Sequence, residues 1–115
     1  MKLTEMDCIP CRGGDPALTE PEIEALMPQV PGWQAVSVDG IPRLQKRFKF
    51  KGYAPAVTFA NAVAALAEQQ DHHPAILLEW GKVTVSWWTH VIKGLHQNDF
   101  VSAAKTEALF EANQN

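Results

Sequence analysis

Histidine side chains are concentrated in two short stretches of this sequence of 115 residues. The first stretch reads Asp71-His72-His73-Pro74, and the second is Thr89-His90, which follows a pair of tryptophans. Histidine has an unperturbed pKa of about 6.5, so an imidazole can donate or accept a proton close to neutral pH. Two or three imidazoles in one place would therefore offer both an acid and a base to one ligand.

Pro74 constrains the backbone of the first stretch. The residue before a proline is pushed out of the helical region, so a helix that leads into this stretch must end at or before His73. His72 and His73 would then project in different directions from a stiff corner. The simpler alternative is a structural role, because a histidine at a helix C-terminus is favoured by the helix dipole and can cap free carbonyl groups.

The hydrophobic pattern around the two stretches predicts how they meet. Apolar residues at helical spacing precede the first stretch, and a hairpin centred on Gly81 connects the two. In an antiparallel hairpin, the start of one strand lies beside the end of the next. We therefore expect His72, His73 and His90 to meet at one end of a sheet, which favours a functional site over a structural role.

The remaining sequence completes one domain. Thr19 and Glu22 form the capping pattern of a helix start, and Asp39-Gly40 is a strong signal for a two-residue hairpin turn. The expected elements are a helix from about 19 to 27, strands at 33–38 and 42–50, a helix at 53–70, strands at 76–80 and 82–88, and a helix at 99–111. The order α-β-β-α-β-β-α predicts an α+β fold, a four-stranded antiparallel sheet with three helices on one face. Residues 1–17 are expected to form an irregular leader before a single domain at 18–115.

Composition and charge exclude several classes of function. Hydrophobic residues make up 46% and charged residues 20% of the chain, as in ordinary globular domains. The formal net charge is -3, whereas nucleic-acid binding normally requires a basic surface. No apolar run approaches the roughly 20 residues needed to span a bilayer, and the N-terminus lacks the apolar core of a signal peptide. We therefore expect a cytoplasmic protein with no nucleic-acid and no membrane partner.

Metal and redox chemistry are alternatives to acid–base chemistry. Cys8 and Cys11 form a single C-x-x-C, which could be half of a zinc site or a redox pair, although an inert, reduced and mobile leader is the simpler interpretation. Three histidines could also hold zinc. Adjacent histidines are poor co-ligands because their side chains diverge, and the spacing that metal sites prefer is absent, so we expect no metal.

The motifs around the histidines together closely resemble those of the pterin-4a-carbinolamine dehydratase family. The family pattern is an acid, then Asp-His-His-Pro, and after a spacer Thr-His, Gly-Leu and an Asp. This sequence has Glu68, Asp71 to Pro74, Thr89-His90, Gly94-Leu95 and Asp99 in that order. The resemblance extends over residues 18–112, and it implies helices on one face of a four-stranded antiparallel sheet.

The resemblance also implies an activity and a set of site residues. Family members remove water from 4a-hydroxytetrahydrobiopterin, which aromatic amino acid hydroxylases release, and give quinonoid dihydropterin for recycling. Many of them form dimers or tetramers. On this basis His72, His73 and His90 would be the catalytic histidines, and no cofactor would be needed. The residues that would bind the substrate or support the histidines are Glu68, Asp71, Pro74, Trp88, Thr89, Val91, Asp99 and Trp33.

One departure and one alternative accompany the resemblance. Trp88 is bulky where animal members of the family have a small residue, and this difference alters the shape of the expected pocket. The alternative function is that of a non-catalytic assembly or regulatory protein on the same scaffold. Relatives that act as Rubisco assembly chaperones lack the full histidine set, so the complete set in this sequence favours the enzyme.

Overall fold

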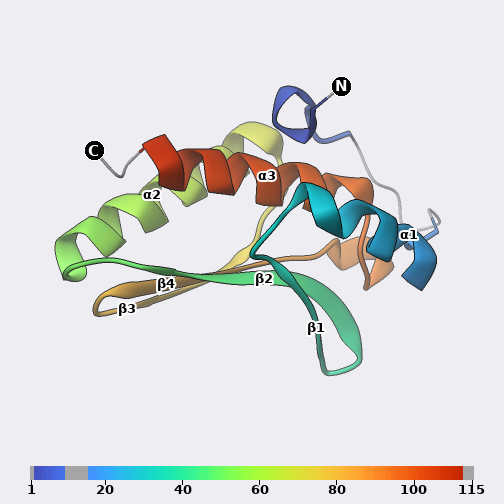
Figure 1. Cartoon of the computed structure of the whole chain (residues 1–115), viewed down its shortest axis with the longest axis horizontal. Helices are drawn as coiled ribbons and strands as arrows, with labels where there is room; N and C mark the ends of the chain where they lie inside the picture. The colour runs from blue at the N-terminus through green and yellow to red at the C-terminus, as the bar shows by residue number, and fades with distance from the viewer. Residues whose placement is uncertain (1, 10–15, 113–115) are drawn as a thin grey trace.

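The chain folds into one antiparallel sheet covered by helices on one face (Figure 1). The computed structural model describes residues 2–9 and 16–112. Three short 3-10 turns, η1 (Leu3–Glu5), η2 (Met27–Gln29) and η3 (His90–Ile92), lie between or before the longer elements. Those elements are α1 (Glu20–Leu26), β1 (Gln34–Val38), β2 (Ile41–Lys49), α2 (Tyr53–Gln70), β3 (Ala75–Glu79), β4 (Lys82–Trp87) and α3 (Gln97–Ala112).

The strand order in the sheet is β1-β2-β4-β3, and every neighbouring pair is antiparallel. Two tight hairpins connect β1 to β2 and β3 to β4. Helix α2 carries the chain from β2, past β4, to the far edge, where β3 begins. The predicted α+β fold with four antiparallel strands and three helices is confirmed, and α2 has the bounds that the sequence predicts.

The hydrophobic core fills the space between the sheet and the helices. Alternate side chains of β2 and β4 point toward the helices, as strand periodicity requires. Phe48 of β2 packs against Phe59 of α2 and Phe110 of α3, with ring centroids 4.8 Å and 4.9 Å away. Lys46 also faces the helices, where its ammonium group pairs with the Glu107 carboxylate of α3. This pairing explains a lysine on an otherwise apolar strand face.

The first helix begins as its sequence predicts. The backbone N–H of Thr19 donates to the Glu22 carboxylate (2.9 Å), and the backbone N–H of Glu22 donates to the Thr19 hydroxyl (3.4 Å). These two reciprocal bonds form a capping box. Within the described ranges, none of the helices is both long enough and apolar enough to cross a membrane.

Candidate active site

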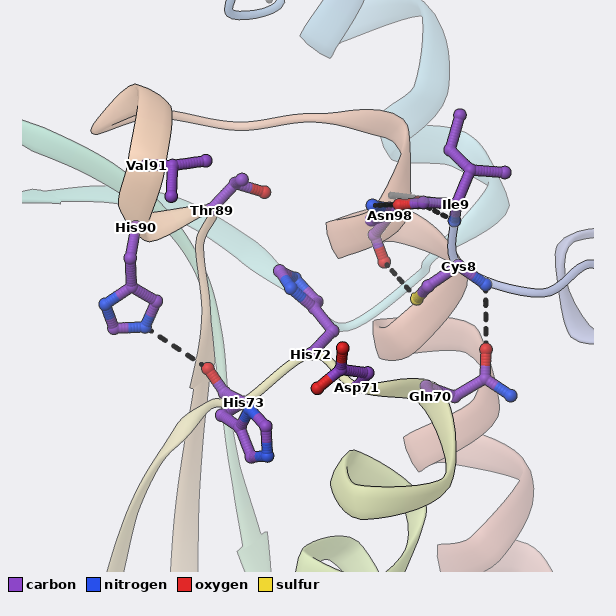
Figure 2. Close-up of a pocket in the computed structure, with 10 residues that line it drawn as sticks. All are labelled: Cys8, Ile9, Gln70, Asp71, His72, His73, Thr89, His90, Val91 and Asn98. Carbon is purple, nitrogen blue, oxygen red and sulfur yellow. Dashed lines mark hydrogen bonds between the residues drawn. The ribbon is translucent and has the colours of Figure 1, made fainter. Parts of the chain in front are cut away.

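A cavity of about 510 Å³ lies at the end of the sheet where α2 passes into β3 and β4 passes into η3. The side chains of His72, His73 and His90 all line it (Figure 2). The histidines therefore meet where the hairpin pattern predicts, although they come from segments distant in sequence. The Nε2–H of His90 donates to the backbone carbonyl of His73 across 3.3 Å, which ties the two segments together.

The end of α2 sends the two neighbouring histidines in different directions. Asp71 adopts a left-handed backbone conformation, with φ of 51°. The backbone N–H of His72 donates to the carbonyl of Ala67 (3.1 Å), and that of Asp71 donates to the carbonyl of Glu68 (3.3 Å). These bonds form a Schellman motif, which ends the helix and turns the chain inward at His72. Pro74 disfavours helical geometry at His73, and the chain continues into β3, which begins at Ala75.

His72 is buried and held by a buried carboxylate. Its Nε2 lies 2.6 Å from Oδ1 of Asp99, and its ring stacks on Trp87 with centroids 5.5 Å apart. Asp99 is fully buried. Its Oδ2 accepts from the Thr89 hydroxyl and from the backbone N–H of His96, each at 2.9 Å. A buried carboxylate with three donors is compensated for its desolvation, and here it fixes the orientation of the imidazole.

His73 is paired in the same way but at the surface. Its Nε2 lies 2.8 Å from Oε1 of Glu68, one turn back on α2, and both side chains are exposed. His90 is exposed as well, and its ring lies against the indole of Trp88, with centroids 4.5 Å apart. The guanidinium of Arg43 covers the Trp88 ring at 3.8 Å from its centroid. Trp88 therefore supports His90 from the side instead of lining the cavity.

The other residues expected at the site fall into three groups. Asp71, Thr89 and Val91 line the cavity, while Glu68 and Asp99 stand behind the histidines they contact. Pro74 is half-buried and acts through the backbone of His73.

Trp33 does not lie at the site. It is buried in the core with its ring 5.8 Å from Phe48, and its indole N–H donates to Glu107 of α3 (3.3 Å). It precedes β1, on the opposite edge of the sheet from β3, and turns under α3. The structure therefore does not bring this residue to the histidines.

The sequence interpretation missed four residues that line the cavity. Cys8 and Ile9 come from the leader, and Gln70 and Asn98 come from the ends of α2 and α3. The simpler interpretation of the sequence is an inert and mobile leader, but residues 2–9 pack on α3, with Leu3 buried in the core. Burial raises the pKa of the Cys8 thiol. Cys11 lies outside the described residues, so the C-x-x-C pair is not described as a unit.

The arrangement offers proton-transfer groups instead of an evident metal centre. Across residues 2–9 and 16–112, no cluster of three or more histidine, cysteine, aspartate or glutamate side chains could hold a metal ion. Two exposed imidazoles and one buried, carboxylate-bound imidazole border a single cavity. Such a set can give one proton and take another from the same ligand.

Comparison with known sequences places this chain in a family. The sequence pattern of the pterin 4 alpha carbinolamine dehydratase family matches residues 16–109. A Syntrophotalea carbinolica protein named "putative pterin-4-alpha-carbinolamine dehydratase" is 51% identical over 110 residues, which are 96% of this chain and 98% of that protein. A Vibrio cholerae protein of the same name is 52% identical over 107 residues, or 93% and 98% of the two chains. The chain therefore belongs to the pterin 4 alpha carbinolamine dehydratase family.

Solved structures share the fold. The crystal structure of a transcriptional coactivator/pterin dehydratase from Brucella melitensis matches with a TM-score of 0.73 and 34% identity, over 82% of this chain and 98% of that one. A pterin dehydratase-like protein, identified as a RuBisCO assembly factor in the alpha-carboxysome, matches with a TM-score of 0.57 and 29% identity. The second match covers 68% of this chain and 88% of that one.

Proposed function

We propose that this protein is a 4a-hydroxytetrahydrobiopterin dehydratase, which converts the pterin-4a-carbinolamine to quinonoid dihydropterin and water. The single observation that carries the proposal is the convergence of His72, His73 and His90 on one cavity. Family membership supplies the substrate class, and the cavity supplies the acid–base groups that the reaction needs. The cavity volume, about 510 Å³, is within the range of small-molecule sites.

The reaction needs two proton transfers at neighbouring atoms. The bond between C4a and its hydroxyl oxygen breaks, and an acid protonates the departing hydroxide to give water. A base takes the proton from the adjacent ring nitrogen, N5, whose electron pair forms the new C=N bond. The step needs no oxidant or reductant, because the electrons that leave with the oxygen are replaced from nitrogen. Two imidazoles in opposite protonation states can perform both transfers.

We assign the proton transfers to His73 and His90. Both are exposed at the cavity and can exchange protons with solvent after each turnover. His72 has its Nε2 bound to the buried carboxylate of Asp99, so it presents a fixed ring to the same cavity. Glu68 orients His73, and Trp88 orients His90, each by direct contact.

The proposal extends to the setting of the enzyme. The substrate is the adduct that aromatic amino acid hydroxylases release, so the resemblance implies a functional link to such a hydroxylase. The same resemblance implies a homo-oligomer, a dimer or a tetramer. A second candidate function is that of a non-catalytic assembly protein, because a neighbour in fold was identified as a RuBisCO assembly factor. The two functions differ in whether the histidines must act as acids and bases.

A coupled assay tests the proposal. An aromatic amino acid hydroxylase generates the 4a-hydroxypterin, and its decay is followed by absorbance with wild type, His73→Ala, His90→Ala and His96→Gln. We expect wild type to accelerate the decay, and each alanine variant to lose about a hundredfold of that acceleration, because general acid–base groups contribute roughly that much. His96 is the control: it does not line the cavity, and His96→Gln keeps the backbone N–H that donates to Asp99. The Gln side-chain oxygen can also accept from the backbone N–H of Asn98 as Nδ1 of His96 does (3.1 Å), so His96→Gln should match wild type.

Two results would contradict the proposal. Decay at the spontaneous rate with folded wild type would remove the activity and leave the assembly function as the better candidate. Full activity in both alanine variants would show that the histidines are structural. Circular dichroism of each variant separates loss of activity from loss of the fold.

A further inference from the structure

The leader forms one side of the cavity through a set of specific bonds. The backbone N–H of Cys8 donates to the side-chain oxygen of Gln70 (2.7 Å). At the next residue, the backbone N–H of Ile9 donates to Oδ1 of Asn98 (3.0 Å), and Nδ2 of Asn98 donates back to the carbonyl of Ile9 (2.7 Å). The Asn98 amide thus pairs with Ile9 as a neighbouring strand would.

Further contacts hold the leader along α3. Leu3 is buried in the core, and the Lys105 ammonium donates to the carbonyl of Thr4 (3.0 Å). The side-chain amide of Gln70 also donates to the carboxylate of Asp7 (3.2 Å). Residues 2–9, which we name the strap, are therefore fixed at several points along their length.

The two main anchors of the strap are joined to the residues that shape the site. Gln70 immediately precedes Asp71 and His72 at the end of α2, and Asn98 immediately precedes Asp99 at the start of α3. The strap is therefore hydrogen-bonded to the same two helix ends that hold the buried histidine–carboxylate pair. These hydrogen bonds fix the position of the strap relative to the cavity.

Cys8 anchors the strap instead of acting as a nucleophile. Its sulfur lies 3.4 Å from the Ser102 hydroxyl and donates to the backbone carbonyl of Asn98 at 3.7 Å. Burial raises the pKa of this thiol, which keeps it protonated at neutral pH. The Cys8 thiol is turned toward α3, and the next residue, Ile9, also lines the cavity.

Ile9 is one of the residues that line the cavity, and its aliphatic side chain is exposed. It is 58% exposed, and Val91, also 58% exposed, lines the same cavity. Figure 2 shows Val91 beside His90 and Ile9 beside Asn98, with His72 between the two groups. Sites for small flat ligands combine apolar walls with a few polar groups that fix orientation. Ile9 and Val91 would provide the apolar walls, and the histidines would provide the polar groups.

We propose that the strap is a wall of the ligand site and that Ile9 is a specificity-determining residue, which contacts the bound heterocycle on the side away from Val91. The identity of the heterocycle as a pterin rests on the proposed function. Because Ile9 offers only apolar contact and no proton, it binds substrate and transition state alike. Its loss should therefore weaken binding and leave the chemical step intact.

Steady-state kinetics of Ile9→Ala, Ile9→Leu and Leu77→Ala test this inference. We expect Ile9→Ala to raise KM roughly threefold to tenfold while kcat stays within about twofold, because part of an aliphatic contact is lost. Ile9→Leu, which keeps an aliphatic side chain of the same size, should have a KM close to that of wild type. Leu77 is the matched control, an aliphatic residue of nearly equal exposure (57%) that lies on β3 away from the cavity, and Leu77→Ala should match wild type.

Direct binding gives a second readout. The dissociation constant of 7,8-dihydrobiopterin, followed by tryptophan fluorescence, should rise in Ile9→Ala by the same factor as KM.

The outcomes separate the two proposals. If wild type is active but Ile9→Ala matches it in both KM and dissociation constant, the strap is not a wall of the site and the dehydratase stands. If wild type neither binds nor dehydrates the pterin, the proposed function fails and this inference fails with it.

Discussion

Two neighbouring histidines in this protein make the same kind of pair in opposite surroundings. His72 lies 2.6 Å from Asp99, and His73 lies 2.8 Å from Glu68. In the first pair the histidine side chain is 10% exposed and the carboxylate 0%, whereas in the second pair the values are 54% and 80%. Distance therefore does not distinguish the pairs, and burial does.

The difference shows that two neighbouring histidines at one turn are suited to different roles, His72 to a structural one and His73 to a chemical one. The left-handed turn at Asp71 sends His72 inward, and His73, held out of the helical region by Pro74, remains exposed. A buried pair fixes the orientation of the imidazole, and removing one partner strongly destabilises the fold because the other partner has lost its water. An exposed pair contributes little to folding and leaves the imidazole free to exchange protons with a ligand.

Breaking the two carboxylates in turn should give the largest contrast. Asp99→Ala leaves His72, the Thr89 hydroxyl and the backbone N–H of His96 without their acceptor. We expect a loss of about 3 kcal/mol or more in the free energy of unfolding, because buried and part-buried donors lose a charged acceptor. Glu68→Ala should cost less than about 1 kcal/mol, as for other exposed ion pairs. Urea denaturation of both variants measures the contrast.

Equal losses of stability in the two variants would contradict the comparison. That result would mean that burial does not set the strength of these pairs, and that Glu68 supports the fold through contacts other than His73. A small loss in Asp99→Ala alone would show that water enters and replaces the carboxylate.

Much of this corner could be predicted from the sequence. The hairpin centred on Gly81 predicts that His90 meets the other two histidines, and Pro74 predicts the extended backbone at His73. These signals are local, because they depend on turn residues and on alternation within short segments. The same is true of the turn at Asp39, whose φ of 54° is the left-handed conformation that such a hairpin requires.

The strap and Trp33 could not be placed in this way. Ile9 and Asn98 are 89 positions apart. A hydrogen bond between a side-chain amide and a distant backbone produces no hydrophobic periodicity in either segment, so the sequence does not predict it. Trp33 carries no signal that separates a core aromatic from a ligand-stacking one, and its ring packs on Phe48. The sequence does not predict the burial of Asp99 either, since an aspartate near a helix start is usually a solvated cap.

Replacing His72 should have the larger effect on stability, and replacing His73 should have the larger effect on activity. His72→Ala leaves Oδ1 of the buried Asp99 without a donor, so we expect a loss of about 1–3 kcal/mol in the free energy of unfolding. His73→Ala should cost less than about 0.5 kcal/mol, since an exposed side chain has water as its alternative partner. The loss of kcat in the coupled assay should be larger for His73→Ala. The comparison fails if one variant shows the larger effect on both quantities.

The smallest effect is expected at Glu22, an exposed carboxylate that has no role in the site. Its contribution to stability is a reference for that of Glu68. The backbone N–H of Thr19, and then its hydroxyl, lower the pKa of Glu22 below its ordinary value of 4.5. A lowered pKa means that the charged form stabilises the fold at neutral pH, and that this contribution is lost as the pH falls through the lowered pKa.

Glu22→Gln keeps the geometry of the capping box but cannot titrate. Its Tm should therefore lie slightly below that of wild type at about pH 7, and the gap should close as the pH approaches about 2 and the wild-type carboxyl becomes protonated. Thermal melts of both proteins over this range measure the gap. A gap that does not change with pH would mean that the charge of Glu22 is irrelevant. A gap that closes gives the contribution of a well-bonded but exposed carboxylate, against which the loss in Glu68→Ala can be judged directly.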